Sequence, residues 1–375
     1  MWTLPIYQDL TTDQRLVIDL PLDESHVITG PPGSGKTVMA VYRAQALQKL
    51  NEPTMLLMYG KLLSTYTKGA IKSLGVLEST VSTMHAWFPK WFKDVYGEMP
   101  PMIDKWNFDW HESFKIVGRN PAPEQLRQHV IIDEGQDLPR EFYQLLGAIS
   151  RSATVFADEN QMIFPDGGSK IKEICAALGT NSQSSLNCNF RNTRSIAVVS
   201  GHFYTGAGSA PVELRESAED GDQPVLDEHG GINEAIEFLV NFEKAHIAEQ
   251  IGLLLPYNSS MKSFLNRLKG KTANPVEVYS SNSTVSQLAA IVDFSKPGIK
   301  VINWQSAKGL EFDTVALLEL QQYKNNDSSA ESFRMKMYML TSRAKRELYF
   351  MYSGEGEPAI IQTLPLSEGL LDDWR

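Results

Sequence analysis

The sequence predicts an α/β protein in which parallel sheets are covered by helices. Strand-like apolar runs alternate with helix-like runs along the chain, which is the pattern of strands joined by crossover helices. The chain has 375 residues, enough for two or three domains. Hydrophobic residues make up 42% of it and charged residues 21%, as is usual for globular proteins.

The first part of the chain, residues 1–178, is expected to form one such domain. A helix is expected at 35–50, directly after the first strand. The segment 86–128 is rich in Trp, Phe, Pro and Lys and has poor periodicity, so we expect a small helical insertion there. The strands are expected at 26–30, 54–59, 129–133 and 153–158.

A second α/β domain is expected over residues 179–375. The polar stretch 215–224 is expected to be a loop within it. Its strands are expected at 184–188, 248–256, 275–279, 298–304, 313–320 and 347–352.

Charge and cysteine content limit the function classes. The net charge is −10 and the pI is about 5.3, which weakens the case for tight, passive DNA binding but leaves room for a local basic groove. The cysteines are Cys175 and Cys188, with no His/Cys cluster, so neither a disulfide framework nor a zinc site is expected. We expect a cytoplasmic protein without a membrane span or a secretory signal.

The stretch "GPPGSGKT" at 30–37 follows a predicted strand and opens a predicted helix. This context and the spacing G-x-x-x-x-G-K-[ST] predict a loop whose backbone N–H groups hold phosphate. Lys36 would reach the β- and γ-phosphates and the Thr37 hydroxyl would hold Mg²⁺. The candidate nucleotide-binding residues are Gly30, Pro31, Pro32, Gly33, Ser34, Gly35, Lys36 and Thr37.

The stretch "HVIIDEGQDLPR" at 129–140 places carboxylates at the end of a predicted buried strand. Asp133 suits the residue that holds Mg²⁺ in a P-loop enzyme, and Glu134 suits the group that polarises an attacking water. These acidic residues also precede a predicted helix, where carboxylates are favourable. For Asp137 this capping role is at least as well supported as a catalytic one.

Asp-Glu-x-Gln-Asp resembles motif II of superfamily 1 helicases of the UvrD/Rep type. That family's other motifs have similar stretches here in the same order, and the resemblance implies two RecA-like domains in tandem. The similar stretches are "LTTDQRLVI" around Gln14, "FADENQMIF" (156–164), "LNCNFRNT" (186–193), "SAKGLEFDTV" (306–315) and "YMLTSRAKRELYF" (338–350).

The resemblance implies an ATP-dependent, Mg²⁺-requiring helicase or translocase that moves 3′ to 5′ on single-stranded DNA. It implies that ATP is hydrolysed in a cleft between the domains. The implied roles are adenine recognition for Gln14, a γ-phosphate contact for Gln161, arginine fingers for Arg191 and Arg343, and a ribose contact for Glu311. Phe190 is expected either near the adenine or in the core.

The DNA-contacting motifs fit the family less well. The family's motif Ia corresponds to "MYGKLL" (58–63), where Lys61 is the candidate phosphate contact. Thr83 and His85 in "STMHAWF" are further candidates. Asn303 and Gln305 replace the usual Thr and His and can still hydrogen-bond a phosphate.

The tryptophans of the insertion allow two interpretations. Trp87, Trp91 and Trp106 have lysine neighbours, and aromatic rings with cations can form a stacking groove for single-stranded DNA. The alternative, which we favour for most of them, is that the rings pack a small core.

Two other functions remain open from the sequence. The family's large insertion in the second domain is missing and the chain is acidic, so an ATP-gated, DNA-sensing subunit that controls a partner protein is the main alternative. A nuclease in a bacterial anti-phage system is one such partner. A P-loop kinase or another NTPase unrelated to nucleic acid is the third reading.

Overall fold

The computed structural model divides into two compact units. The N-terminal unit is built from Thr3–Asn187 and the C-terminal unit mainly from Cys188–Thr205 and Pro211–Arg375. The division therefore follows residue 187, later than the expected 178. The structure describes residues 5–60, 63–64, 67, 71, 75–162, 167–206, 213–279, 292–323, 331–354 and 356–375.

The described strands of the N-terminal unit form one parallel sheet in the order β3-β2-β4-β5-β1-β6. Its central strands are buried on both faces because helices cover both sides. This order puts the carboxyl ends of β4, β5 and β1 next to one another. The strands are β1 (His26–Thr29), β2 (Thr54–Leu57), β3 (Val81–Ser82), β4 (His129–Ile132), β5 (Ser152–Ala157) and β6 (Gln183–Ser185).

Helices of the N-terminal unit cover this sheet. Helix α2 packs on β2, β4 and β5, whereas α6 packs on β5 and α7 on β1. The buried Arg43 of α2 donates to Thr154 of β5 and to backbone carbonyls before β1, which ties the helix to the sheet. The helices are α1 (Thr12–Asp19), α2 (Lys36–Lys49), α4 (Met84–Tyr96), α5 (Trp110–Arg119), α6 (Arg140–Ile149) and α7 (Ile171–Leu178).

The strand expected at 184–188 belongs to the first sheet, not to the second. Strand β6 pairs in parallel with β1, and the backbone N–H of Leu186 donates to Thr29 at 2.8 Å. The short polar sequence of β6 suits the edge of a sheet, where one side of the strand is exposed. Sequence alone could not assign this strand because either sheet could take a polar edge.

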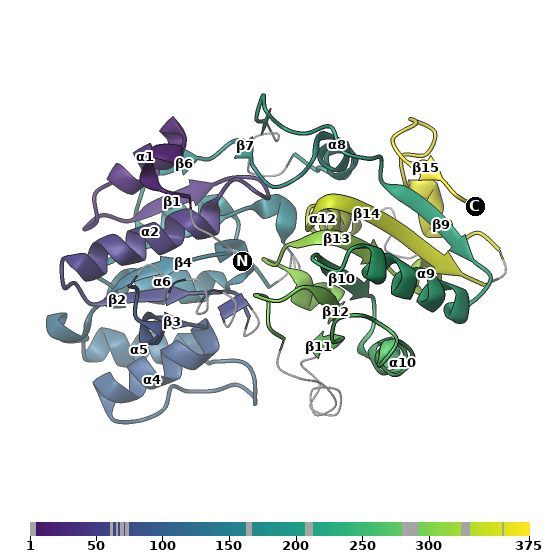
Figure 1. Cartoon of the computed structure of the whole chain (residues 1–375). Helices are drawn as coiled ribbons and strands as arrows, with labels where there is room; N and C mark the ends of the chain where they lie inside the picture. Colours follow the sequence, from purple (N-terminus) through teal and green to yellow (C-terminus); the bar gives the residue numbers. More distant parts are fainter. Residues whose placement is uncertain are drawn as a thin grey trace. The chain divides into compact units, whose positions relative to one another are not determined.

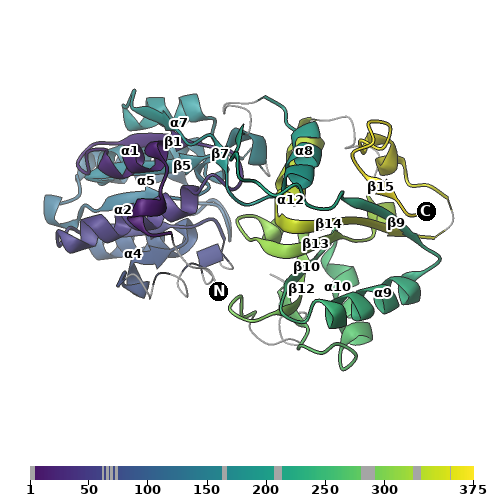
Figure 2. The same cartoon turned by 45° about the horizontal axis from the view of Figure 1, so that its top comes forward.

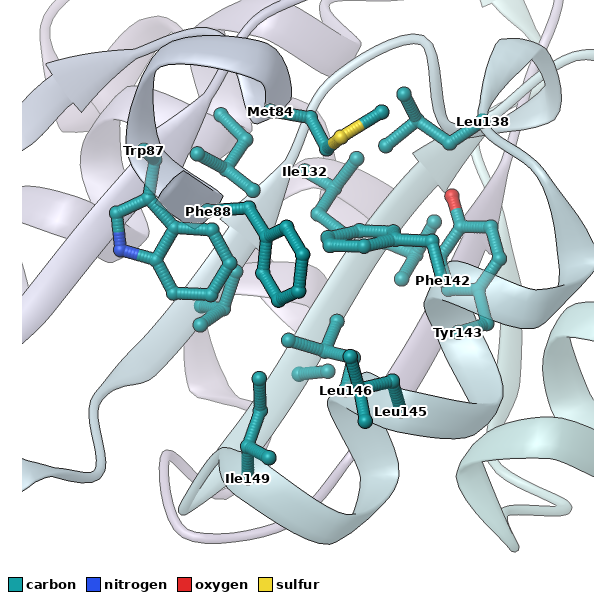
Figure 3. Close-up of a cluster of buried hydrophobic side chains, with 14 of the residues drawn as sticks. Met84, Trp87, Phe88, Ile132, Leu138, Phe142, Tyr143, Leu145, Leu146 and Ile149 are labelled. Carbon is teal, nitrogen blue, oxygen red and sulfur yellow. The ribbon is translucent and has the colours of Figure 1, made fainter. Parts of the chain in front are cut away.

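The segment 86–128 is largely helical, and its aromatic rings form a core with α6 and β4. Trp87 and Phe88 of α4 face Phe142 of α6 and Ile132 of β4 (Figure 3). Trp87 and Trp91 are only 5% and 6% exposed, which confirms the packing interpretation for these two rings. Trp106, in the loop between α4 and α5, is 70% exposed and is not a core residue.

The described strands of the C-terminal unit form a second parallel sheet in the order β11-β12-β10-β13-β14-β9-β15. Cys188–Asn189 (β7) pairs separately with Glu213–Leu214 (β8). The sheet strands are β9 (Val225–His229), β10 (Gln250–Leu255), β11 (Glu277–Tyr279), β12 (Gly298–Asn303), β13 (Phe312–Leu317), β14 (Ala344–Ser353) and β15 (Asp372–Asp373).

Helices lie on both faces of the second sheet. Helices α9 (Ile232–Ala245) and α10 (Asn258–Leu268) lie together on one face, and α8 (Arg194–His202) and α12 (Glu331–Thr341) on the other (Figures 1 and 2). The expected class, two parallel-sheet α/β units of the RecA-like type, is confirmed. Among the described residues, no helix has the length and apolar character needed to cross a membrane.

Short 3-10 helices connect the larger elements and place several candidate residues. They are η1 (Tyr7–Asp9), η3 (Glu78–Thr80), η4 (Glu124–Leu126), η5 (Gly135–Asp137), η6 (Glu159–Gln161), η7 (Trp304–Ala307), η8 (Leu320–Gln322) and η10 (Ala359–Thr363).

The aromatic core of the insertion predicts a difference between two aromatic substitutions. Phe88 is fully buried among Trp91, Phe108 and Trp110, so Phe88→Ala should leave a cavity and lower the free energy of unfolding by about 3–5 kcal/mol. Trp106→Ala should change it by less than about 0.5 kcal/mol because the ring is exposed. Urea unfolding measures both; equal losses would contradict this placement of the core.

Candidate functional site

The glycine-rich loop connects β1 to α2, as the motif predicts. Gly33 and Gly35 have φ values of 75° and 88°, which a residue with a Cβ rarely adopts. The Lys36 ammonium lies within the loop, where it donates to the carbonyl oxygens of Gly30 at 2.7 Å and Pro31 at 3.0 Å. The loop and the N-terminus of α2 thus form a site suited to phosphate.

Asp133 lies at the end of β4, beside the start of α2. The Thr37 hydroxyl donates to one oxygen of its carboxylate at 2.6 Å, and the backbone N–H of Glu134 donates to the other at 3.1 Å. Burial and the nearby charge of Glu134 raise the pKa of Asp133, and the Thr37 hydrogen bond and the Lys36 charge oppose this. Hydroxyl and carboxylate oxygens side by side are ligands that suit Mg²⁺.

Glu134 has an unusual backbone and a fixed carboxylate. Its φ of 57° is in the left-handed region, and its side chain is 5% exposed. One carboxylate oxygen accepts a hydrogen bond from the Gln136 amide at 2.7 Å. Strained backbone of this kind in a buried acidic residue is typical of functional sites.

The third neighbouring strand, β5, is followed by Asp158, which organises η6. Its carboxylate accepts hydrogen bonds from the backbone of Asn160 at 3.0 Å and from the Gln161 amide at 2.7 Å. The backbone N–H of Asp158 donates to the Gln136 side chain at 3.0 Å. Gln161 therefore belongs to the same buried network as Glu134.

Gln14 stabilises the phosphate loop from α1. Its side chain forms a capping box with Thr11 at the start of the helix and donates to the Ser34 carbonyl at 3.1 Å. A Cβ at Gly35 would lie 2.7 Å from the Gln14 amide nitrogen, so the glycine permits this close approach. The implied contact with adenine stays a prediction.

A buried hydroxyl in the loop bears on whether the residues present fit a phosphate group. The Ser34 hydroxyl oxygen is buried and has no hydrogen-bond partner within the described residues. Such groups are costly unless a ligand or water satisfies them. The Ser34 hydroxyl and the Lys36 ammonium can donate to phosphate oxygens, and Thr37 and Asp133 can hold Mg²⁺, so the residues present fit a nucleotide with Mg²⁺.

The C-terminal unit brings together residues from three of the similar stretches. Arg191 donates to Glu311 at 2.9 Å and to the Ser342 carbonyl at 3.2 Å, and Lys345 pairs with the other oxygen of Glu311 at 3.1 Å. Burial opposes ionisation of Glu311, but the charges of Arg191 and Lys345 outweigh it and lower the pKa of that carboxyl.

Arg343 lies in the same unit but is 1% exposed. Its guanidinium donates to the carbonyls of Met339 at 2.8 Å and Leu310 at 3.3 Å. Phe190 is half-buried, which leaves both of its interpretations open. The arginine-finger, ribose and adenine roles in this unit stay predictions.

The candidate DNA contacts have different environments. Thr83 precedes α4, and His85 is exposed with its ring stacked on Phe108 at 5.6 Å between centroids. Contact of the ring with its neighbours lowers the pKa of His85 by desolvation, and a hydrogen bond with the Trp106 backbone opposes this. Lys61 lies outside the described residues.

The remaining candidates lie at the end of β12 and just after it, in the C-terminal unit. The buried Asn303 side chain accepts a hydrogen bond from the backbone of Gln305 at 2.8 Å, whereas the Gln305 side chain is exposed. Asn303 therefore shapes the turn that presents Gln305.

Sequence reasoning missed three residues of these clusters. Gln136 and Asp158 connect Glu134 to Gln161, and Lys345 is the second cation on Glu311. Asp158 could have been found because it ends a predicted strand, 153–158, as Asp133 ends the predicted strand 129–133. For Gln136 the signal was its place inside Asp-Glu-x-Gln-Asp; nothing in the sequence pointed to Lys345.

Fold and site define the N-terminal unit as a P-loop nucleotide-binding domain. Residues 14–165 match a family model described as an AAA domain. This match contains the phosphate loop, Asp133 and Glu134. No curated protein matches the chain.

Two solved structures are similar to the chain. The C-terminal domain of a possible DNA helicase from Lactobacillus plantarum WCFS1 has 17% identity and a TM-score of 0.35, over 50% of this chain and 99% of that one. A PRRSV helicase has 14% identity and a TM-score of 0.40, over 90% of this chain and 54% of that one. The AAA match and the P-loop residues, rather than these two structures, assign the class.

The close packing at Gly135 gives a prediction about the site. A Cβ there would lie 2.3 Å from a Val155 methyl and 2.7 Å from the Tyr143 hydroxyl, which donates to the Gly135 carbonyl. Gly135→Ala should lower the free energy of unfolding by about 1–3 kcal/mol. The matched control Gly118→Ala, at an exposed helical position with no atom within 4 Å, should raise it by up to about 1 kcal/mol.

Urea unfolding of both glycine variants checks this prediction. Equal effects of the two substitutions would contradict the packing around Gly135.

Proposed function

We propose that this protein hydrolyses ATP with Mg²⁺ and uses the cycle to move on single-stranded DNA, in the 3′ to 5′ direction. The observation that carries the proposal is the pairing of Thr37 with Asp133 beside the Lys36 ammonium, with the buried Glu134 next in the chain. The AAA match over residues 14–165 supports nucleotide binding. The direction and the DNA substrate depend on the resemblance to superfamily 1 helicases.

In the proposed ATP hydrolysis, each of the site residues of the N-terminal unit has a different role. Thr37 and Asp133 would hold Mg²⁺, which neutralises charge on the transferred phosphoryl group when bound. Lys36 would exchange its carbonyl partners for phosphate oxygens. Glu134 would orient the attacking water and accept its proton, and Gln161 would respond to the γ-phosphate.

In this proposal Arg191 and Arg343 also bind ATP, because a planar guanidinium presents N–H donors in a fixed geometry that suits phosphate oxygens. ATP binding would then favour closure of the two units, and hydrolysis would allow them to open again. The Arg191–Glu311 pair means that Arg191 must exchange at least part of its hydrogen bonding on ATP binding. Glu311 would keep Lys345 as a partner, so the exchange would not leave its carboxylate buried and unpaired.

A second candidate function is an ATP-gated, DNA-sensing subunit that controls a partner protein such as a nuclease. Trp87 and Trp91 are buried and cannot stack on bases. The loop between α4 and α5 exposes Met99, Ile103 and Trp106, which suits an apolar protein surface better than a polyanion. These observations favour the second candidate over duplex unwinding.

Two substitutions separate nucleotide binding from hydrolysis. Glu134→Gln should bind ATP with near wild-type affinity but lower the turnover number by about 10²-fold or more, because the amide cannot accept the proton. Lys36→Ala should lose both binding and turnover, because phosphate loses its cation. Fluorescent-nucleotide binding and phosphate release measure these effects; a wild-type rate for Glu134→Gln would remove it as the base.

ATP turnover with and without single-stranded DNA, at several salt concentrations, tests the function itself. DNA stimulation that fades as salt rises indicates that the ATP cycle is coupled to phosphate contacts. His85→Ala should reduce this stimulation severalfold and spare basal turnover, whereas His111→Ala, an exposed histidine of α5, should change neither. Turnover that ignores DNA would favour the partner-controlled candidate, and an unchanged response of His85→Ala would remove His85 from the DNA contacts.

A further inference from the structure

One side chain connects Glu134, the proposed base, to Asp158, which holds the amide of Gln161. The Gln136 side chain is completely buried, and its amide nitrogen donates to the Glu134 carboxylate at 2.7 Å. Its amide oxygen accepts the backbone N–H of Asp158 at 3.0 Å. Gln136 therefore spans from the end of β4 to the end of β5.

The donor and acceptor groups available fix the direction of each hydrogen bond in this series, which runs from Glu134 through Gln136 and Asp158 to Gln161. The backbone N–H of Asp158 can only donate, so the Gln136 oxygen must face it and the amide nitrogen must face Glu134. The Asp158 carboxylate can only accept when ionised, so the Gln161 amide nitrogen must face it, at 2.7 Å. A flip of the Gln136 amide, which exchanges its oxygen and nitrogen, would therefore break the hydrogen bonds to both Asp158 and Glu134.

The backbone of Gln136 is held separately from its side chain. Its carbonyl oxygen accepts the backbone N–H of Ser169 at 2.9 Å, and a Cβ at Gly168 would lie only 2.2 Å from the same oxygen. Substitution of the side chain leaves these contacts in place. The side-chain hydrogen bonds can thus be tested without removing the backbone contacts that hold η5.

We infer that Gln136 is a positioning residue, which fixes the carboxylate of Glu134 and, through Asp158, the amide of Gln161 in one buried hydrogen-bonded chain. The inference rests on the proposed ATP hydrolysis and assigns Gln136 no contact with ATP. A carboxylate torsion is soft, so loss of the Gln136 hydrogen bond widens the range of orientations that the Glu134 carboxylate can adopt. Small misplacements of a catalytic group cost up to about 10²-fold in rate.

The first test compares Gln136→Met with the wild-type protein. Methionine keeps the length and apolar volume but makes neither hydrogen bond. We expect the turnover number to fall about 10- to 100-fold, with KM and the dissociation constant for ATP changed less than about threefold. The reason is that the phosphate loop and the Thr37–Asp133 pair do not involve Gln136.

A matched control has the same chemistry far from the site. Gln48 of α2 also bridges two groups through its amide, donating to Thr80 at 2.6 Å and accepting from the backbone of Leu77 at 3.2 Å. Gln48→Met removes the same kinds of bond from the same fold. It should leave the turnover number within about twofold of wild type, whatever it does to the melting temperature.

A second variant covers the case in which Gln136→Met does not fold. Gln136→Glu keeps the side-chain length and an oxygen for the Asp158 N–H but turns a second oxygen toward Glu134. It should also bind ATP and lose turnover, because two buried carboxyl groups at this distance share a proton and Glu134 can then no longer act as a free base. A wild-type turnover number for Gln136→Glu would overturn the inference.

A double-mutant cycle tests the connection to Gln161. If both residues act through Asp158, Gln161→Ala should lower turnover much less in Gln136→Met than in the wild-type background. Independent, multiplicative losses would overturn the connection. Wild-type turnover in Gln136→Met would overturn the positioning role while leaving ATP hydrolysis intact, and a wild-type protein that hydrolyses no ATP would overturn the proposed function together with this inference.

Discussion

The hydrogen bond between Thr37 and Asp133 joins residues 96 positions apart, and the arrangement of the N-terminal unit depends on the constraint behind it. The phosphate loop and the acidic pair follow different strands, so the two meet only if β4 and β1 end at the same edge of one sheet. Parallel pairing of both strands with β5 fulfils this condition. It also brings Asp158, at the end of β5, between them in strand order.

The polar side chains at this edge of the sheet are buried and therefore require hydrogen-bond partners. Asp133, Glu134, Gln136 and Asp158 are all at most 5% exposed, and each would be costly without partners. Their hydrogen bonds satisfy one another, so the cluster is held together as a unit and not as separate surface side chains. The left-handed backbone of Glu134 and the tight packing at Gly135 are compatible with this because the surrounding core fixes η5.

The aromatic insertion and the C-terminal unit show how similar residue types take different roles. Trp87 and Trp106 have lysine neighbours in the sequence, yet one fills a core and the other is exposed. Arg191 and Arg343 both come from stretches similar to helicase motifs, yet one pairs with a carboxylate and the other is enclosed by backbone carbonyls. Residue type gives the chemistry that is available, and packing decides which part of it a ligand can reach.

The sequence by itself determined the parallel α/β class, the phosphate loop and the roles open to Lys36, Thr37, Asp133 and Glu134. These follow from local spacing, because strand–loop–helix junctions are encoded by contiguous residues. Tertiary structure alone decided that β6 joins the first sheet, that Trp87 is core, and that Gln136 joins Glu134 to Asp158. Each of these depends on which strands become neighbours and which side chains lose water, and no local pattern records that.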